Sequence, residues 1–335
     1  MARARRARTQ ILYQGRDLSR FVIDFTYTDN YDQTDDISMT LADRDKRWAS
    51  DWFPETGEII DATIQLFDWN REGDNRSLSL GTFEIDNIGF SDTVSINAVA
   101  APITSSIRSE KKNRTWKDIS LKNIATDMAD GAVLKLAYKT KVNPFYDVAD
   151  QNGKSDLEFL EDLCKSDGLC LKVSARQLIV FEEAKFEAEP TRLTIHEGIS
   201  PIIDFPKFRR NAKDVYKACE VAHFDPKTDK TYVGFFEAPC VGNVGHTLKL
   251  REQFNSESDD INLDRKARAR LREKNKNEWT CNLRMHGDII YFTGVNVDIK
   301  GWHRFDGKYH ITTCSHSIGS GYSVNLSLRK CLEGY

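Results

Sequence analysis

The first and last thirds of the chain alternate between apolar and polar residues, and this pattern constrains the fold more than any other feature. Alternation with a period of two, rich in β-branched and aromatic residues, predicts half-buried antiparallel strands. In the first third it covers residues 20–27, 36–41, 82–88 and 93–99. In the last third it predicts strands at residues 279–285, 289–297, 308–313 and 322–328. Both ends of the chain are therefore expected to be β-structured.

The two β-rich regions also share an order of motifs. The segment GEIIDAT at residues 57–63 reappears as GDIIYFT at 287–293, and GTFEI at 81–85 reappears as GKYHI at 307–311. Two further matches join residues 94–98 to 324–328 and residues 36–41 to 278–283. Such a repeat indicates duplication of one antiparallel β-barrel, with Ile59 and Ile289 in the barrel interiors. Chance similarity is the alternative, since unrelated antiparallel barrels also share glycine turns and β-branched strands.

The middle of the chain has a different character. Apolar residues at helical spacing predict a helix that begins after Asp118 and stops at Gly131. A second helix is expected from Ser155 to Gly168, and the pair Ser155 and Glu158 fits a capping box. A hairpin at 169–181 follows, and residues 182–190 are interpreted as a linker. These elements predict a small α+β domain.

The predicted fold is therefore mainly β with an α+β insert, built from two tube-protein-like antiparallel barrels related by duplication. Its expected domains are a first barrel at 1–105, an α+β insert with its linker at 106–195, and a second barrel at 196–335. The second barrel is interrupted by one helix at about residues 263–275, for which Asn262 is the predicted cap.

Charge and composition exclude several classes of protein. The chain of 335 residues has 48 Lys+Arg against 51 Asp+Glu, a net charge of −3, which argues against a dedicated nucleic-acid binder. No apolar run approaches the roughly 18 residues of a membrane span, and no secretion signal is recognised at the start. The seven cysteines form no CxxC pair, so we expect reduced, buried thiols rather than a zinc or redox site.

No catalytic, cofactor-binding or metal-binding residue is predicted. A cluster of acids in the first third suggests a metal loop or a pair of catalytic carboxylates, but we expect a charged surface with turn caps instead: Asp29, Asp32, Asp35, Asp36, Asp43, Asp45 and Asp51. His310 and His316, with Cys314 between them, share a strand face and give a weak hint of a metal site. Motifs of common hydrolases and nucleotide-binding loops do not occur.

Two cationic segments remain to be explained. The first is an N-terminal arm that contains Arg3, Arg5, Arg6 and Arg8; we expect a flexible tail that orders on assembly. The second is the predicted helix at 263–275, whose solvated face would carry Arg265, Lys266, Arg268, Arg270, Arg272 and Lys274, with Lys276 just beyond it. Neither segment has the aromatic residues that stack on bases, so both are interpreted as protein contacts rather than nucleic-acid contacts.

Several motifs, in the same order along nearly the whole chain, resemble the phage late control D family of contractile-tail hub proteins. They are IDFTYTDN at 23–30, DDISMTLADR at 35–44, Trp48 with WFPETG at 52–57, GTFEID at 81–86, RSEKKNRTW at 108–116, and SDLEFL at 155–160 with Leu163 and Cys164. Each motif alone is weakly specific, but together and in this order they make the resemblance fairly specific.

The resemblance implies a homotrimeric baseplate hub in a contractile phage tail or a phage-tail-like particle. Such a hub adapts the sixfold tail tube to the threefold central spike, and it contacts tape-measure and baseplate proteins. Three copies of a duplicated barrel would present six similar barrels, and pairing of exposed strand edges between protomers would then make oligomerisation obligatory. A virion-tail location, after assembly in the host cytoplasm, is implied.

The resemblance also implies what the chain lacks. Type VI secretion relatives carry a fused spike, whereas the sequence stops at Tyr335, so the spike is expected to be a separate polypeptide. No enzyme activity, cofactor, small-molecule substrate or membrane insertion is expected. Two alternatives stay open, namely a tail-associated peptidoglycan hydrolase and an effector-carrying spike component of an injection system.

Overall fold

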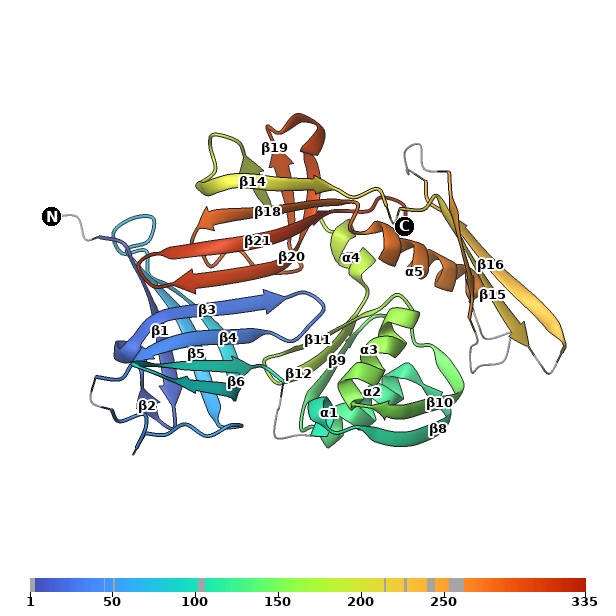
Figure 1. The fold of residues 1–335 in the computed structure, drawn as a ribbon. Coiled ribbons are helices and arrows are strands. Elements are labelled where there is room, and N and C mark those ends of the chain that lie inside the picture. The colour runs from blue at the N-terminus through green and yellow to red at the C-terminus, as the bar shows by residue number, and fades with distance from the viewer. Residues whose placement is uncertain are drawn as a thin grey trace.

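The computed structural model of the chain consists mostly of strands. It describes residues 4–44, 46–50, 52–101, 106–213, 215–225, 228–239, 245–252 and 262–335. One sheet has 13 strands, and three smaller sheets have two, three and three strands. In Figure 1 the large sheet runs from β14 at the top to β6 at the bottom, and the helical part lies to one side.

The first half of the large sheet is built by the N-terminal third. Its strands are β1 (Arg6–Tyr13), β2 (Arg16–Asp17), β3 (Val22–Asn30), β4 (Asp36–Ala42), β5 (Ile59–Phe67), β6 (Arg76–Phe90) and β7 (Thr93–Val99), with the short helix η1 (Ser19–Phe21). They lie in the order β1-β5-β6-β7-β4-β3, and every neighbouring pair is antiparallel. Successive residues point to opposite faces, so in β4 Ile37, Met39 and Leu41 are buried while Ser38 is exposed.

The second half is built by the C-terminal part of the chain. Its elements are β13 (Leu193–His196), β14 (Ile202–Arg210), β18 (Trp279–His286), β19 (Asn296–Lys300), η2 (His303–Phe305), β20 (Gly307–Ile318) and β21 (Tyr322–Lys330). Their order is β13-β19-β20-β21-β18-β14, which repeats the order of the first half with β14 in the place of β3. Only the outermost pair differs in direction, because β13 is parallel to β19.

Details of the backbone repeat as well. The ladder between β6 and β7 shifts register after Ile85, and the ladder between β20 and β21 shifts after Ile311. The N–H of Gly57 donates to the carbonyl of Ile85 at 2.8 Å, and the N–H of Gly294 donates to that of Ile311 at 3.1 Å. Both glycines have a positive φ, +87° and +79°. The predicted fold class, two related antiparallel barrels with an α+β insert, is confirmed.

The predicted alignment of the two halves needs two corrections. Gly57 corresponds to Gly294 rather than to Gly287, because residues 287–293 lie in the connection before β19, so the strand expected at 289–297 begins only at Asn296. The counterpart of Leu41 in β18 is Met285, because Leu41 pairs with Val94 and Met285 with Val324; the predicted counterpart, Leu283, lies two residues earlier. A slip of two residues keeps each side chain on its face, so alternation alone could not detect it. Ile59 is 43% exposed; its neighbour Ile60 is the buried residue.

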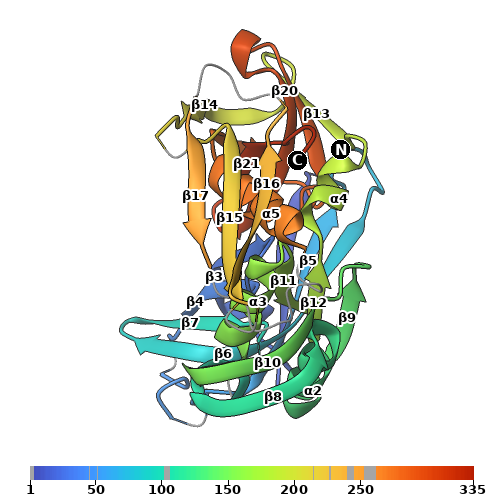
Figure 2. The same cartoon turned by 90° about the vertical axis from the view of Figure 1, so that its right-hand side faces the viewer.

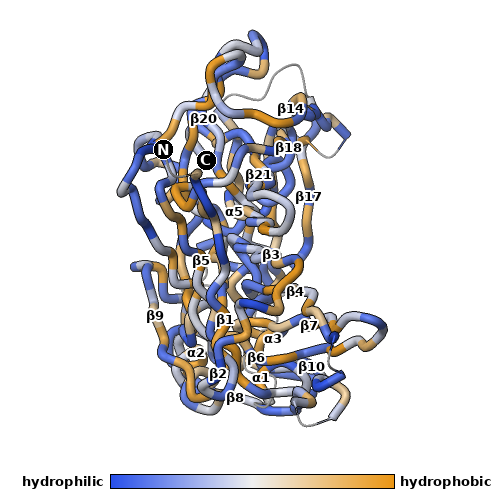
Figure 3. The backbone as a smooth tube through the Cα atoms, turned by 90° about the vertical axis from the view of Figure 1, so that its left-hand side faces the viewer, coloured by the Kyte–Doolittle hydropathy of each residue, from blue (hydrophilic) through white to orange (hydrophobic). Residues whose placement is uncertain are grey.

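The two halves join through one ladder. Strand β3 pairs antiparallel with the second part of β20, from Asn30 opposite Thr313 to Phe25 opposite Ile318. Buried apolar residues of both halves consequently form a single cluster, which includes Phe25, Phe83 and Val324. Along the strands in Figure 3, hydrophilic and hydrophobic colours alternate, as this one-sided burial requires.

The insert has its own core between the helices and two small sheets. Its elements are α1 (Ser106–Ser109), β8 (Lys112–Ser120), α2 (Leu121–Gly131), β9 (Lys135–Lys139), β10 (Phe145–Lys154), α3 (Asp156–Ser166), β11 (Cys170–Ser174), β12 (Gln177–Phe181) and α4 (Glu183–Ala188). The capping box of Ser155 and Glu158 is confirmed. The helix predicted to begin after Asp118 is α2, and its cap is Ser120, because Asp118 belongs to β8. The expected linker at 182–190 contains α4.

A further module lies between β14 and β18. Strands β15 (Ala218–Asp225), β16 (Lys230–Glu237) and β17 (Thr247–Arg251) form a three-stranded sheet, and α5 (Leu263–Asn275) packs on it. Figure 2 shows this sheet in front of α5. The predicted helix and its Asn262 cap are confirmed: the Asn262 side chain accepts a hydrogen bond from the N–H of Arg265.

Candidate functional site: a polar sheet face and buried ion pairs

The face of the large sheet that turns away from the apolar core is lined by small polar residues. We call this surface the polar face; it is formed by Thr26, Thr28, Ser38, Thr40, Ser95, Asn97, Asn282, Thr313, Ser315, Ser317, Asn325 and Ser327. It continues across the junction of the halves, where the hydroxyls of Thr26 and Ser317 lie 3.3 Å apart. The same face also carries charges of both signs: Asp36 lies opposite Thr28, and Arg284, opposite Asn325, is 3.9 Å from Asp204.

Three groups of ion pairs hold the insert against the large sheet and against α5. In the first, Lys172 on β11 contacts Asp35 at 2.9 Å and Asp29 on β3 at 2.5 Å. Burial opposes the charge of Lys172, but Asp29 and Asp35 raise its pKa, so the ammonium form is retained. The second oxygen of Asp29 accepts a 2.7 Å hydrogen bond from the N–H of Thr293. One carboxylate therefore joins the first half, the insert and the second half.

The second group lies beneath α4. Glu183 and Glu187 face Arg272 of α5 and Arg329 of β21, with 2.6 Å between Arg329 and Glu183. Burial disfavours the charge, yet Arg329, Lys276 and Arg272 lower the pKa of Glu183 to about 2. The Glu183 carboxylate therefore keeps its charge in the interior, where it depends on these partners.

The third group overturns the prediction of a solvated cationic face on α5. Arg265 and Lys266 contact Asp167, which follows α3, at 2.6 and 2.8 Å. Arg270 contacts Glu252 at 2.7 Å, and Arg272 belongs to the group beneath α4. Lys266 and Arg272 are less than a tenth exposed. Much of the positive charge of this helix is therefore paired inside the molecule, by Asp167, Glu183 and Glu187 of the insert and by Glu252 of the helix's own module.

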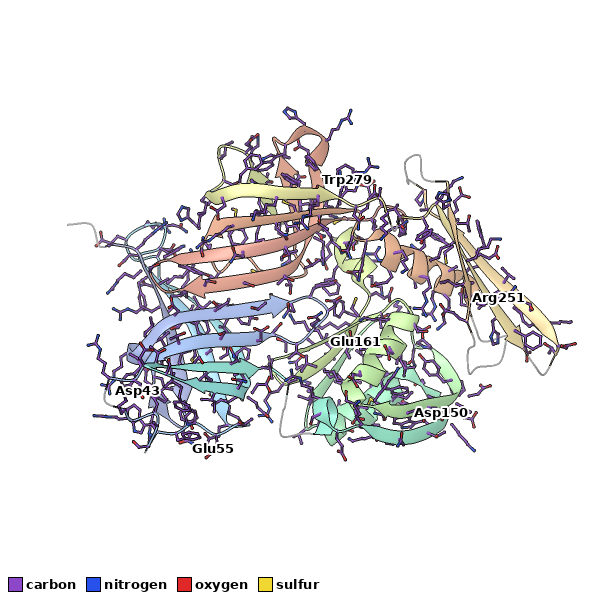
Figure 4. All side chains as sticks on the ribbon, viewed as in Figure 1. Asp43, Glu55, Asp150, Glu161, Arg251 and Trp279 are labelled. Carbon is purple, nitrogen blue, oxygen red and sulfur yellow. The ribbon has the colours of Figure 1, made fainter. Side chains whose placement is uncertain are left out.

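The predicted acidic cluster divides into several environments. Asp29 and Asp35 are buried with Lys172, which corrects the expectation of a charged surface. Asp43 is also buried and accepts a hydrogen bond from the N–H of Trp48 at 3.3 Å, so it does act as a turn cap; Figure 4 shows it at the lower end of the first half. Asp32 and Asp36 are partly exposed. Asp45 and Asp51 lie outside the described residues.

His310, Cys314 and His316 are all buried on β20. His310 contacts the side chain of Asn296 at 2.8 Å, whereas His316 contacts the hydroxyl of Tyr322 at 2.7 Å. Burial lowers the pKa of His316 to about 4, which keeps its ring neutral at pH 7. Cys314 lies 3.3 Å from His316. Within the described ranges, no three His, Cys, Asp or Glu side chains gather in a way that could hold a metal ion.

The cationic N-terminal arm is not a free tail from Arg6 onward, because Arg6 begins β1 and pairs with Phe67 of β5. Arg5 lies over the ring of Trp69, 4.9 Å from its centre. Arg3 lies outside the described residues. None of the helices in the described part of the chain is long and apolar enough to span a membrane.

Sequence reasoning missed the partners of the buried charges. Glu183 and Glu187 are one helical turn apart, which is the only local sign that both point the same way. A second sign comes from the duplication. Arg329 pairs with Thr280, and Val99 pairs with Asp36, the counterpart of Thr280 in the first half, so Arg329 is the counterpart of Val99. A charge where the other copy has an apolar residue indicates a new ion pair.

Comparisons with known proteins show the fold. No protein-family model matches the chain, and no curated protein matches it in sequence. The tail protein from Neisseria meningitidis is similar in structure, with a TM-score of 0.71 and 12% identity over 97% of this chain and 96% of that chain. The 43 kDa tail protein of prophage MuSo2 from Shewanella oneidensis has a TM-score of 0.66 and 12% identity over 97% of both chains.

A third solved structure comes from an injection system. It is an Escherichia coli component of the type VI secretion system that itself resembles the bacteriophage T4 tail proteins gp27 and gp5. It matches with a TM-score of 0.58 and 11% identity over 97% of this chain and 78% of that chain. The chain therefore has the fold of these phage tail and type VI secretion proteins, and its resemblance to the late control D family is confirmed at the level of the fold.

Proposed function

We propose that three copies of the chain form the ring-shaped hub of a contractile tail or a tail-like particle. The observation that carries this proposal is the repeated strand order β5-β6-β7-β4-β3 and β19-β20-β21-β18-β14 in one polypeptide. Three copies supply six similar units, which suit a sixfold tube on one side, while the inserts and the module of α5 repeat only three times. The hub then adapts the tube to a threefold spike made by another polypeptide.

The polar face supports the same role. In a closed ring, the curved sheet of each protomer turns one face toward the ring axis, and a lining of hydroxyl and amide groups suits a channel that must not hold its contents tightly. The expected partners are the tube, spike, tape-measure and baseplate proteins, and the expected location is the centre of the baseplate. The units 1–105, 106–195 and 196–335 are proposed as its domains.

A non-enzymatic role is part of the proposal. A hollow of the surface lined by Arg5, Arg8, Asp24, Arg284 and His286 among others contains one carboxylate, whereas hydrolysis of a glycan by the common mechanism uses two. Among the buried acids, Asp29, Asp35, Asp167, Glu183 and Glu187 contact cations, and Asp43 accepts a backbone hydrogen bond. These features favour a structural role over the peptidoglycan hydrolase and over an effector carrier.

The test is the mass of the purified chain in solution, followed by cryo-electron microscopy of the chain mixed with its tube and spike proteins. The expected result is a trimer placed between a sixfold and a threefold component. A chain that stays monomeric with both proteins present, or that joins the outer baseplate instead, contradicts the hub role. Release of soluble fragments from purified cell walls would favour the hydrolase.

A further inference from the structure

The two halves differ in what their edge strands contact. Strand β3 of the first half pairs with the second part of β20, as described above. By the duplication, β14 corresponds to β3, and the second part of β6 corresponds to the second part of β20. Within the described residues, β14 pairs only with β18, and residues 87–90 of β6 pair only with β7. Figure 1 shows β14 at the top of the large sheet and β6 in its lower part.

The internal symmetry fixes how these two edges would meet. Tyr27 lies opposite Ile37, and Phe208 lies opposite Cys281, which occupies the same place in β18 as Ile37 in β4. His316 of β20 likewise corresponds to Phe90 of β6. Because Tyr27 pairs with His316 inside the chain, the same geometry brings Phe208 opposite Phe90.

We infer that β14 of one protomer pairs antiparallel with residues 87–91 of the neighbouring protomer, with Phe208 opposite Phe90, Arg209 opposite Gly89 and Lys207 opposite Ser91. This inference rests on the proposed trimer and names the strands that close it. The occupant of each edge is a second copy of this chain. Around the ring, three junctions of this kind between protomers alternate with the three β3–β20 junctions, one of which lies within each protomer.

The backbone groups point in the required directions. The N–H of Asn211 donates to the carbonyl of Glu278 beside β18 at 2.7 Å, so Phe208 and Arg210 direct their N–H groups to the open edge. In the reference junction, the carbonyl of Thr312 accepts from the N–H of Tyr31 at 3.0 Å. The same alternation places the N–H groups of Ile88 and Phe90 at the open edge of β6. Both edges thus offer hydrogen bonds in the same register.

The side chains are complementary as well. Residues 207–210 carry Lys207, Arg209 and Arg210, and residues 86–92 carry Asp86 and Asp92. Arg210 contacts Glu278 at 3.1 Å and Asp86 contacts Arg108 at 3.5 Å within the chain, so the complementary charges are those of Lys207 and Arg209 against Asp92. Phe90 is 42% exposed, an apolar surface that Phe208 of the neighbour would cover. Pro206 has no N–H to donate, so the ladder is expected to end before it. Opposite charges across such an edge favour this pairing over pairing of two identical edges.

A disulfide tests the register. In antiparallel sheets, residues of a non-hydrogen-bonded pair have Cα atoms about 4.5 Å apart, close enough for a disulfide. Ser91 and Lys207 form such a pair and are exposed, so the variant Ser91→Cys/Lys207→Cys should give covalent dimers and trimers, and nothing larger, under mild oxidation. The unaltered chain controls for its own cysteines, and Ser91→Cys/Ile203→Cys controls for register with a second cysteine at an exposed site on the same strand.

The outcomes separate this inference from the proposed function. A trimer by mass that gives no Ser91–Lys207 cross-link, or that cross-links equally in the control, overturns the pairing and leaves the hub intact. Cross-linking that stops at dimers shows two identical edges meeting and overturns both. A second variant, Lys207→Glu/Arg209→Glu, should weaken trimer formation at least tenfold by analytical ultracentrifugation, while Lys213→Glu leaves it unchanged; an unchanged trimer in the double variant contradicts the inferred interface.

Discussion

The two halves of the large sheet have kept the same interior and acquired different surroundings. Both place a register shift after an isoleucine of the longest strand, Ile85 or Ile311, and both hold that isoleucine through a glycine of positive φ. The turn from Tyr31 to Asp35 that joins β3 to β4 is short, whereas residues 211–278 replace it in the second half and include β15–β17 and α5. Duplication therefore conserved the packing unit and varied its connections.

The difference shows where the second half gained its ion pairs. The module of α5 brings Lys266 and Arg272 against the insert, and Arg329 replaces an apolar position of the first half to complete the group beneath α4. Among the described residues, the first half contributes Asp29 and Asp35 to the buried contacts, and Asp86 forms an exposed ion pair with Arg108 of the insert. We conclude that the second half fixes the insert, while the first half supplies the simpler barrel.

Replacing Arg329 should give the largest difference in stability between equivalent positions of the two halves. Arg329→Met leaves Glu183 and Glu187 buried with fewer cations, and loss of one partner from a buried ion pair costs about 3–5 kcal/mol. The matched control is Val99→Met at the equivalent position of the first half, which should cost clearly less because Val99 is only partly buried and no buried charge loses its partner. Urea unfolding followed by tryptophan fluorescence measures both. Equal midpoints for the two variants would show that the ion-pair group contributes nothing to stability.

The isoleucines at the register shifts test the opposite expectation, namely that equivalent interior positions of the two halves contribute equally to stability. Ile85 and Ile311 are both fully buried, so Ile85→Ala and Ile311→Ala should each lower the free energy of unfolding by about 2–5 kcal/mol. The control Ile59→Ala removes an exposed side chain and should stay within about 0.5 kcal/mol. A large cost in one half and none in the other would mean that the two interiors are not equivalent.

The second half should contribute a pH dependence to the stability of the chain that the first half lacks at the equivalent position, because His316 stands where the first half has Phe90. Burial lowers the pKa of His316 to about 4 from 6.5, so the unfolded chain binds a proton more readily between these values. Stability is therefore lost as the pH falls from 6.5 toward 4, by up to about 3 kcal/mol for this residue.

The variant His316→Gln isolates this contribution. Urea unfolding measured at several pH values between 4 and 7 gives the free energy of unfolding. In the variant this free energy should fall less steeply with decreasing pH than in the unaltered chain, by about 1.4 kcal/mol per pH unit near pH 5. His310, whose pKa burial lowers to about 3, remains in both proteins and controls for the other buried imidazole. Parallel curves for the two proteins would show that His316 takes up no proton on unfolding.

Local patterns in the sequence predicted the parts of the fold that depend on local physics. Alternation reports which face of a strand is buried, and the capping box of Ser155 and Glu158 needs only four residues. The motif GxII failed as a register marker because it forms a turn and a strand near Gly57 but only a connection near Gly287. Lys172 and its partner Asp29 are 143 residues apart, so no local signal joins them. The trimer stays a prediction.

The glycines of the repeated turn give the smallest expected effect and test whether the corrected alignment is the right one. Gly57 and Gly294 have φ near +80°, a conformation in which a residue with a Cβ costs about 1–2 kcal/mol. Gly294→Ala should cost an amount near the upper end of this range, because its new Cβ would also meet the ring of Tyr31 at 3.3 Å. The control is Gly245→Ala, where a Cβ meets no atom within 4 Å and φ is not in the left-handed range. Thermal unfolding measures all three. If Gly294→Ala matches the control, Gly294 is not the counterpart of Gly57 in any energetic sense.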